Sequence, residues 1–148
     1  MTQMPSQGGF LLSRAHRLSK RVFNRLLMER GIPINSGQGR ILFVLLKEEG
    51  ISIQQLAERA SLSPSTLTSM LDRMEEDDLV KRRRSEGDRR AILLFLGEKA
   101  QDLRRDYMDL SKDMTELFYE GFSREERNDL EGYLIRIIQN LEAVERSW

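Results

Sequence analysis

The sequence predicts a mainly α-helical chain of 148 residues with a small β-wing, a hairpin in its central part. Apolar residues recur at three- and four-residue spacing through several long stretches, which is typical of amphipathic helices. Residues 79–80 and 91–96 instead form two short apolar runs around a polar turn at Gly87, which is typical of a β-hairpin. With 39% hydrophobic and 32% charged residues, the composition favours a folded, helix-rich protein.

The helix that precedes this hairpin begins at Ser63. Ser63 is a favourable N-cap, and Pro64 suits the first helical position because its missing N–H is not needed there. One face of the helix is apolar and holds Leu67, Met70, Leu71 and Met74. The opposite face holds short hydroxyl side chains and one cation, namely Ser65, Thr66, Thr68, Ser69 and Arg73. Such a face can lie close to another surface.

A shorter helix is predicted just upstream, where Ser52 and Gln55 form an S-x-x-Q capping box. Two helices joined by a short turn, the second presenting hydroxyl groups, are typical of a helix-turn-helix. The hairpin that follows is rich in cations: Lys81, Arg82, Arg83, Arg84, Arg89 and Arg90. Residues 36–96 therefore predict a winged helix-turn-helix, whose second helix suits a DNA major groove and whose wing suits the minor groove or phosphates.

This stretch resembles the MarR family of bacterial transcription regulators. The resemblance rests on the run DRMEEDDLV at 72–80, on Arg82-Arg83, on Asp88-Arg89-Arg90 and on LGEK at 96–99, and it continues more loosely over nearly the whole chain. Three positions depart from the family pattern. Asp78 replaces the usual Gly, Gly97 stands where Thr or Ser is common, and Ala100 stands where Gly is common. These are cap and turn positions, so they affect local geometry more than function.

Long helices are predicted on both sides of the winged part, over residues 9–31 and, as two helices, over residues 98–147. Their apolar faces are larger than a winged domain can cover. An intertwined homodimer would cover them and place the two recognition helices on one face. The length favours a single domain over residues 1–148, with the outer helices for dimerisation.

Composition excludes several function classes. There is no cysteine, which excludes disulfides, zinc thiolates and the peroxide-sensing cysteine that some MarR-family members use. The single histidine has no neighbouring ligand residues, so the sequence predicts no metal site and no cofactor. The sequence also lacks a phosphate-binding glycine loop, which argues against an enzyme. The sequence has no apolar run long enough to cross a bilayer and no signal pattern, so we expect a cytoplasmic protein without a membrane partner.

Charge is unevenly distributed along this chain of zero net charge. Residues 1–62 have a balance of +5 and residues 98–148 a balance of −5, while residues 79–90 hold six cations and two anions. Zero net charge alone argues against a nucleic-acid partner. DNA interacts with the local charge of the surface that it contacts, so the basic wing still predicts a nucleic-acid partner.

The expected contacts with double-stranded DNA divide between helix and wing. The hydroxyls of the helix reach bases or phosphates, Arg73 holds a phosphate or a guanine, and Ser63 aims backbone amides at a phosphate. In the wing, Arg84 and Arg89 contact phosphates. The family resemblance implies that Asp88 and Arg90 act together, Asp88 pairing with a neighbouring arginine and Arg90 entering the minor groove. Asp72 would brace a wing arginine. The alternative is a solvated helix face and a solvated turn.

The resemblance also implies a small aromatic or anionic effector between the dimerisation helices and the winged part. The candidate lining residues are Phe10, Arg14, His16, Arg17, Gly39 and Phe43. Because the family often has an aromatic residue near position 39, Gly39 is expected to leave open space there. The predicted function is a homodimeric repressor or activator on a pseudo-palindromic operator, with half-sites ~10 base pairs apart.

One alternative function stays open, a winged-helix protein-interaction module without specific DNA binding. Zero net charge and the acidic run at 75–78 favour it.

Overall fold

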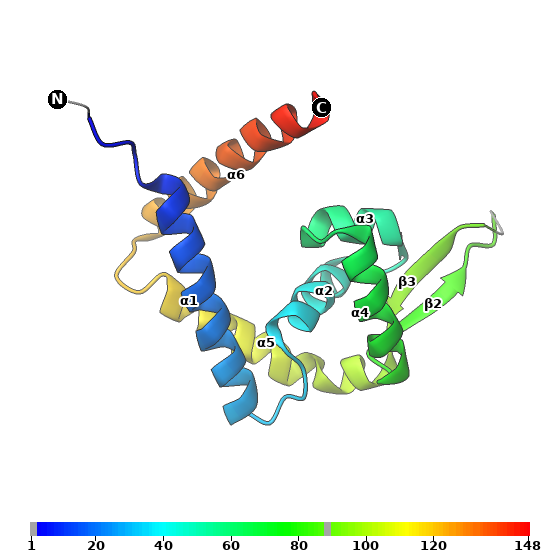
Figure 1. Cartoon of the computed structure of the whole chain (residues 1–148). Coiled ribbons are helices and arrows are strands. Elements are labelled where there is room, and N and C mark those ends of the chain that lie inside the picture. The colour runs from blue at the N-terminus through cyan, green and yellow to red at the C-terminus, as the bar shows by residue number, and fades with distance from the viewer. Residues whose placement is uncertain (1–2, 88–89) are drawn as a thin grey trace. The chain divides into compact units, whose positions relative to one another are not determined.

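The structure is a computed structural model that describes residues 3–87 and 90–148 (Figure 1). The elements, in order, are α1 (Gly8–Glu29), α2 (Ser36–Lys47), β1 (Ile51–Ser52), α3 (Ile53–Ala60), α4 (Pro64–Glu76), β2 (Val80–Arg84), β3 (Ile92–Leu96), α5 (Glu98–Phe118) and α6 (Arg124–Arg146). This order confirms the predicted mainly α-helical fold with a small wing. The chain forms two compact units, Met1–Ser111 and Lys112–Trp148, so that α5 contributes to both.

Local capping signals determine where several helices begin. The predicted caps at Ser52 for α3 and Ser63 for α4 are confirmed, because each serine side chain accepts a backbone N–H at the helix start. Ser123 caps α6 in the same way. A further cap, at Asn35 before α2, was not predicted from the sequence. The Asn35 side chain accepts from Gln38 N at 2.9 Å, while Gln38 Oε1 accepts from Asn35 N at 3.1 Å.

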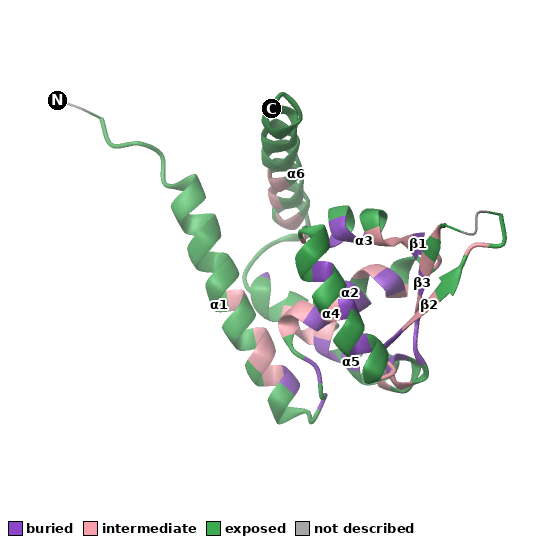
Figure 2. Cartoon of the chain, turned by 45° about the vertical axis from the view of Figure 1, so that its right-hand side comes forward, coloured by how far each residue is buried: buried purple, intermediate pink, exposed green. Residues whose placement is uncertain are grey.

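The core of the first unit lies between the helices and the three-stranded sheet. The sheet has the order β1-β3-β2, and both pairings are antiparallel. Buried residues come mainly from α2, α3, α4 and α5, and Figure 2 shows α1 exposed along most of its length. The side chains with no exposed surface are Ile41, Leu45, Leu56, Leu67, Leu71, Met74, Leu79, Val80, Leu94 and Leu110. Among the described residues, no helix is both long and apolar enough to cross a membrane.

Gly39 lies under two aromatic rings. A Cβ at this position would lie 3.2 Å from the Phe23 ring and 3.3 Å from the Tyr107 ring. The Tyr107 hydroxyl donates to Gly39 O at 2.7 Å, and the Phe23 and Tyr107 rings meet edge-to-face. The expectation of open space at Gly39 was therefore wrong, because side chains from α1 and α5 fill it.

Two departures from the family pattern meet in one turn. Asp78 has φ of +56°, a conformation that favours glycine. Its carbonyl oxygen accepts from Lys99 N at 3.1 Å and would overlap a Cβ on residue 97. Thr or Ser cannot occupy position 97 while this turn persists. Glycine at 97 thus accommodates the carbonyl of the unusual aspartate at 78.

The second unit exposes much apolar surface. Within the described part of α6 no residue is buried. Its exposed apolar side chains are Tyr133, Ile135, Ile137, Ile138, Leu141 and Val144. In the first unit, α1 likewise exposes Phe10, Leu11, Leu18 and Val22. Exposed apolar residues in such numbers mark a contact surface.

Replacing Gly97 by alanine tests the close approach of Asp78. Gly97→Ala is expected to lower the free energy of unfolding by about 1–3 kcal/mol, because the new methyl group overlaps a backbone oxygen. The measurement is urea denaturation at a fixed protein concentration. Gly132→Ala is the matched control, since it lies in α6 with no atom within 4 Å of its added Cβ, and it should be stabilising. Equal midpoints for Gly97→Ala and the unchanged protein would contradict the packing.

Ionisation of Tyr107 should lower the free energy of unfolding at alkaline pH. Burial raises the pKa of the Tyr107 hydroxyl above its usual value, and a side-chain hydrogen bond with Ser111 partly offsets this. The folded state therefore favours the protonated phenol. The resulting contribution to the free energy of unfolding is complete below the ordinary tyrosine pKa and is lost as pH rises through the raised pKa of Tyr107. Tyr107→Phe should cost about 1 kcal/mol at neutral pH, and its deficit should shrink at high pH. A deficit that stays constant in urea titrations from neutral to strongly alkaline pH would count against this.

Candidate nucleic-acid interface

Helix α4 presents one polar face outward and buries the other. Leu67, Leu71 and Met74 have no exposed surface. Every residue predicted on the polar face is exposed: Ser63, Ser65, Thr66, Thr68, Ser69 and Arg73. Burial of the apolar face thus sets the direction in which the hydroxyl face points.

Some hydroxyls on this face bond within the helix. Ser63 Oγ donates to Thr66 Oγ1 at 2.8 Å and accepts from Thr66 N at 3.3 Å. Thr68 Oγ1 donates to Pro64 O at 2.8 Å. Contacts from these hydroxyls to another molecule must therefore add to or replace bonds already made. Ser65 Oγ also lies 3.4 Å from Ser63 Oγ, and Ser69 lies beside them on the outward face.

The turn between α3 and α4 is fixed by backbone geometry. Ser61 adopts φ of +54°, and Leu62 N donates to Ala57 O at 3.0 Å. From α2, Arg40 donates to Ala60 O at 3.3 Å. Arg40 was not among the residues singled out from the sequence. Its contact helps to hold α3, and with it the start of α4, against the scaffold helix.

Strand β2 carries its cations on both faces of the wing. Side chains alternate along a strand, so Arg82 and Arg84 share the face of the buried Val80, and Lys81 and Arg83 share the other. Lys81 Nζ lies 3.8 Å from Glu98, and the Arg83 guanidinium lies 5.0 Å from the centre of the Phe95 ring. Neither is directed at the recognition helix.

Arg82 joins the wing to α4. Its Nη2 donates to Asp72 Oδ1 at 2.7 Å, and its Nε lies 3.2 Å from Glu75 Oε2, an ion-pair distance without the alignment of a hydrogen bond. Only 26% of the Arg82 side chain is exposed, whereas 62% of Asp72 and 47% of Glu75 are. One wing arginine thus offsets two carboxylates at the edge of α4.

Two further wing arginines are exposed and lie nearer the tip. Arg84 ends β2 opposite Ile92, and Arg90 precedes β3. Because it shares the face of Arg82, Arg84 projects on the side of the sheet that carries α4. The predicted pair of Asp88 with an arginine, and the predicted phosphate contact of Arg89, lie outside the described residues. In Figure 1 the hairpin extends beyond the helices of its unit.

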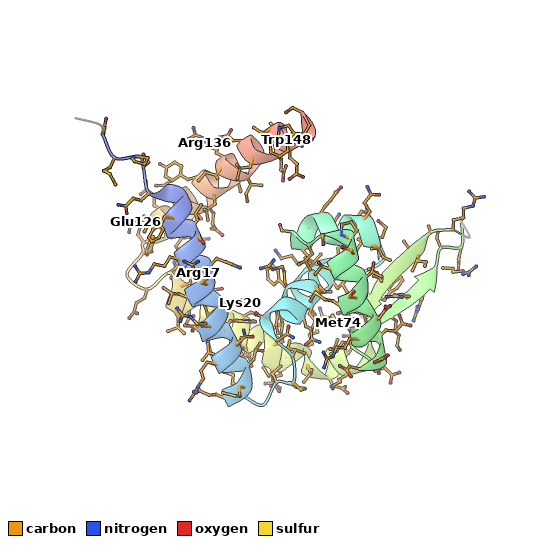
Figure 3. The ribbon with its side chains drawn as sticks, in the orientation of Figure 1. Arg17, Lys20, Met74, Glu126, Arg136 and Trp148 are labelled. Carbon is orange, nitrogen blue, oxygen red and sulfur yellow. The ribbon has the colours of Figure 1, made fainter. Side chains whose placement is uncertain are left out.

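The residues predicted to line an effector cleft are spread along α1. Phe10, Arg14, His16 and Arg17 are exposed, and Figure 3 shows Arg17 projecting from the helix. Phe23 is the α1 residue beside Gly39. At ~1.5 Å of rise per residue, Arg17 lies about 9 Å and Phe10 about 20 Å from Phe23 along the axis of α1.

The sixth of these residues, Phe43, is partly exposed, with Lys47 Nζ 4.3 Å from its ring centre. One chain does not bring the six predicted residues together. The described residues include no cluster of three or more His, Asp or Glu side chains that could hold a metal.

An exposed helix of a helix-turn-helix beside a basic hairpin defines a winged-helix DNA-binding protein. Comparison with known proteins identifies the family. Residues 34–92 match the MarR family. The chain is 32% identical over 117 residues to the organic hydroperoxide resistance transcriptional regulator of Bacillus subtilis, covering 74% of this chain and 78% of that protein. The chain belongs to the MarR family of DNA-binding transcriptional regulators and is not an enzyme.

Solved structures share the fold. A mutant of MarR from E. coli, complexed with operator DNA, has a TM-score of 0.77 at 22% identity, with coverage of 87% of this chain and 91% of that one. The PcaV transcriptional regulator of Streptomyces coelicolor, in complex with its natural ligand, has a TM-score of 0.79 at 21% identity, with coverage of 94% and 98%.

Loss of the Arg82 contacts should loosen the wing. We predict that Arg82→Ala speeds hydrogen exchange of the β2 amides and of the last turn of α4, because both carboxylate contacts disappear together. Arg84→Ala is the matched control, since it lies on the same strand face and its side chain is more exposed. The measurement is amide exchange followed by mass spectrometry. Equal exchange in the two variants would show that Arg82 does not hold the wing.

Proposed function

We propose that the protein is a homodimer that binds a pseudo-palindromic operator and regulates transcription from it. The observation that carries this proposal is the outward hydroxyl face of α4 beside the arginine-bearing hairpin. Two copies related by a two-fold axis would present two such helices to successive major grooves. The expected half-site spacing is one helical turn, ~10 base pairs.

In this proposal α4 reads bases. Ser65 and Ser69 are small and exposed, so a base edge can approach them closely and bond to their hydroxyls. Thr68 already donates to the helix backbone, which leaves its methyl group to meet a thymine methyl. Thr66 and Ser63 act near the helix start, where backbone amides favour a phosphate. Arg73 holds a phosphate or a guanine.

The wing supplies the contacts that do not depend on sequence. Arg90 enters the minor groove, while Arg84 and Arg89 hold phosphates. Asp88 pairs with a neighbouring arginine to stiffen the loop. Asp72 fixes the direction of the wing through Arg82, a role supported by their 2.7 Å contact. Lys81, Arg82 and Arg83 have partners within the protein, so fewer cations reach DNA than the hairpin contains.

Dimerisation is supported by the exposed apolar residues of α1 and α6. Such residues on two long helices are covered economically by a second copy of the chain. Residues 9–31 and 98–147 would then form the dimerisation part of one functional domain over residues 1–148. In a dimer of this kind, the packing of the outer helices sets the distance between the two α4 helices. We expect it to act in the cytoplasm, where DNA is accessible.

A small aromatic or anionic effector would release or retain DNA by favouring one spacing of the two helices. PcaV, which shares the fold, is described in complex with its natural ligand. The present chain contains no cysteine, so a thiol cannot be its sensor. The six residues predicted to line a cleft form a site in this proposal only if a second copy brings the start of α1 to Gly39 and Phe43.

The rival function, a protein-interaction module, is favoured by the acidic residues at the end of α4. Two carboxylates on this helix, Asp72 and Glu75, already face Arg82. Glu76 and Asp77 remain exposed. A linear fall of the logarithm of DNA affinity with the logarithm of salt concentration would exclude the protein-interaction module. Such a fall arises because each phosphate contact releases counterions.

Three variants separate base readout from backbone contact. Ser65→Ala and Ser69→Ala should each lower the ratio of operator affinity to random-DNA affinity about fivefold, because each removes one neutral hydrogen bond worth about 1 kcal/mol. Arg90→Ala should weaken both affinities and reduce the salt slope by about one. Fluorescence anisotropy over a salt series measures all of these quantities. Equal losses on operator and random DNA for all three variants would contradict the division of roles.

A further inference from the structure

Ser85 directly follows the arginines of β2. It ends the run RRRS at 82–85, so that an arginine lies two positions and another three positions before a hydroxyl side chain. No other serine or threonine of this sequence has an arginine at both of these positions. Basophilic serine/threonine protein kinases recognise this arrangement, because carboxylates of the kinase bind the guanidinium groups. Ser85 therefore has the sequence surroundings of a phosphorylation site.

The backbone before Ser85 suits the substrate groove of a kinase. Protein kinases bind their substrates as extended segments, and residues 80–84 form the extended strand β2. In the described part of the chain, β2 pairs with β3 alone, so one edge of β2 is left without a neighbouring strand. Ser85 is partly exposed and its N donates to Ala91 O at 2.9 Å, while Glu86 and Gly87 after it are exposed. The hairpin thus presents an extended segment that ends at the serine.

The arginines before Ser85 differ in how easily a kinase can reach them. Arg83 and Arg84 are exposed, whereas only 26% of the Arg82 side chain is exposed. Asp72 and Glu75 of α4 both form ion pairs with Arg82. A kinase can bind Arg83 without breaking an ion pair with α4, but it must compete with two carboxylates for Arg82. Phosphorylation of the folded protein is therefore expected to depend mainly on Arg83.

We propose that Ser85 is phosphorylated by a basophilic protein kinase and that the phosphate weakens DNA binding by the wing. In this reaction Ser85 Oγ attacks the γ-phosphorus of ATP, and the bond from that phosphorus to ADP breaks. The hydroxyl proton passes to a base of the kinase, so the products are a phosphoserine monoester and ADP. The effect on DNA rests on the proposed function, in which Arg84 and Arg90 contact DNA.

A phosphate at position 85 changes the charge of the wing where DNA is expected to lie. Phosphoserine carries a charge of about −1.5 to −2 near neutral pH. Arg84 precedes Ser85 in the chain, and Arg90 precedes Ala91, whose carbonyl is hydrogen-bonded to Ser85 N across the hairpin. Charge-assisted hydrogen bonds from these two arginines to the phosphoserine compete with their contacts to DNA. The new charge also repels the phosphates of DNA.

Phosphorylation is tested on the purified whole chain with MgATP and the catalytic subunit of cAMP-dependent protein kinase, a basophilic kinase. Mass spectrometry of peptides locates the phosphate. The unchanged protein should be phosphorylated at Ser85, and Ser85→Ala should not be phosphorylated. Arg83→Ala should react about tenfold more slowly, because it lacks the accessible guanidinium. Ser19 is the internal control: it has Arg17 two positions before it but lies inside the helical backbone of α1, so it should stay unmodified.

DNA affinity is compared before and after the kinase reaction by fluorescence anisotropy over a salt series. Random-sequence duplex DNA is the probe, because the proposed wing contacts do not depend on sequence. Phosphorylated protein should bind this DNA about tenfold more weakly, and the salt slope of its affinity should fall by about two, because fewer DNA phosphates are neutralised. Ser85→Ala treated with the kinase should bind DNA as the untreated unchanged protein does.

Three results would overturn the proposal: no phosphate at Ser85, equal phosphorylation of Ser19, or the same DNA affinity with and without the phosphate on Ser85. Failure of the untreated protein to bind any DNA, with Ser85 still phosphorylated by the kinase, would instead contradict the proposed function.

Discussion

The DNA-facing surface depends on the burial of one side of α4. Leu67, Leu71 and Met74 are fully buried, and each such side chain contributes about 1.5–3 kcal/mol to holding the helix. Because the periodicity of a helix links its faces, this burial also determines which residues point outward. The hydroxyl face carries no long side chain except Arg73, so it can approach a partner closely. The caps at Ser63 and the fixed turn at Ser61 set where that face begins.

Several cations of the wing contact other residues of the protein. Arg82 is held between two carboxylates of α4, and Lys81 and Arg83 also contact neighbours. These contacts explain how a chain of zero net charge can present a locally basic surface: part of its acidic charge at α4 is offset by Arg82, while Arg84 and Arg90 are exposed. The orientation of the wing and the charge of the recognition helix therefore depend on the same guanidinium.

The helices, the caps at Ser52 and Ser63 and the wing could be predicted because each depends on residues close together in sequence, such as Ser52 with Gln55. The filled space at Gly39 could not, because Phe23 and Tyr107 arrive from helices far along the chain. Asp78 and Gly97 looked like unrelated departures, yet they compensate for each other across one turn. The predicted effector residues were chosen for their side-chain chemistry, but four of them lie at separate positions along α1.

The central claim is that two α4 helices read a two-fold DNA site. The most direct measurement is selection of bound duplexes from a random DNA pool by the purified protein at near-physiological salt, followed by sequencing. The account predicts enrichment of a pseudo-palindrome with half-sites ~10 base pairs apart. Failure to enrich any motif, with a protein shown to be folded and dimeric, would contradict specific readout by α4 and favour the interaction-module function.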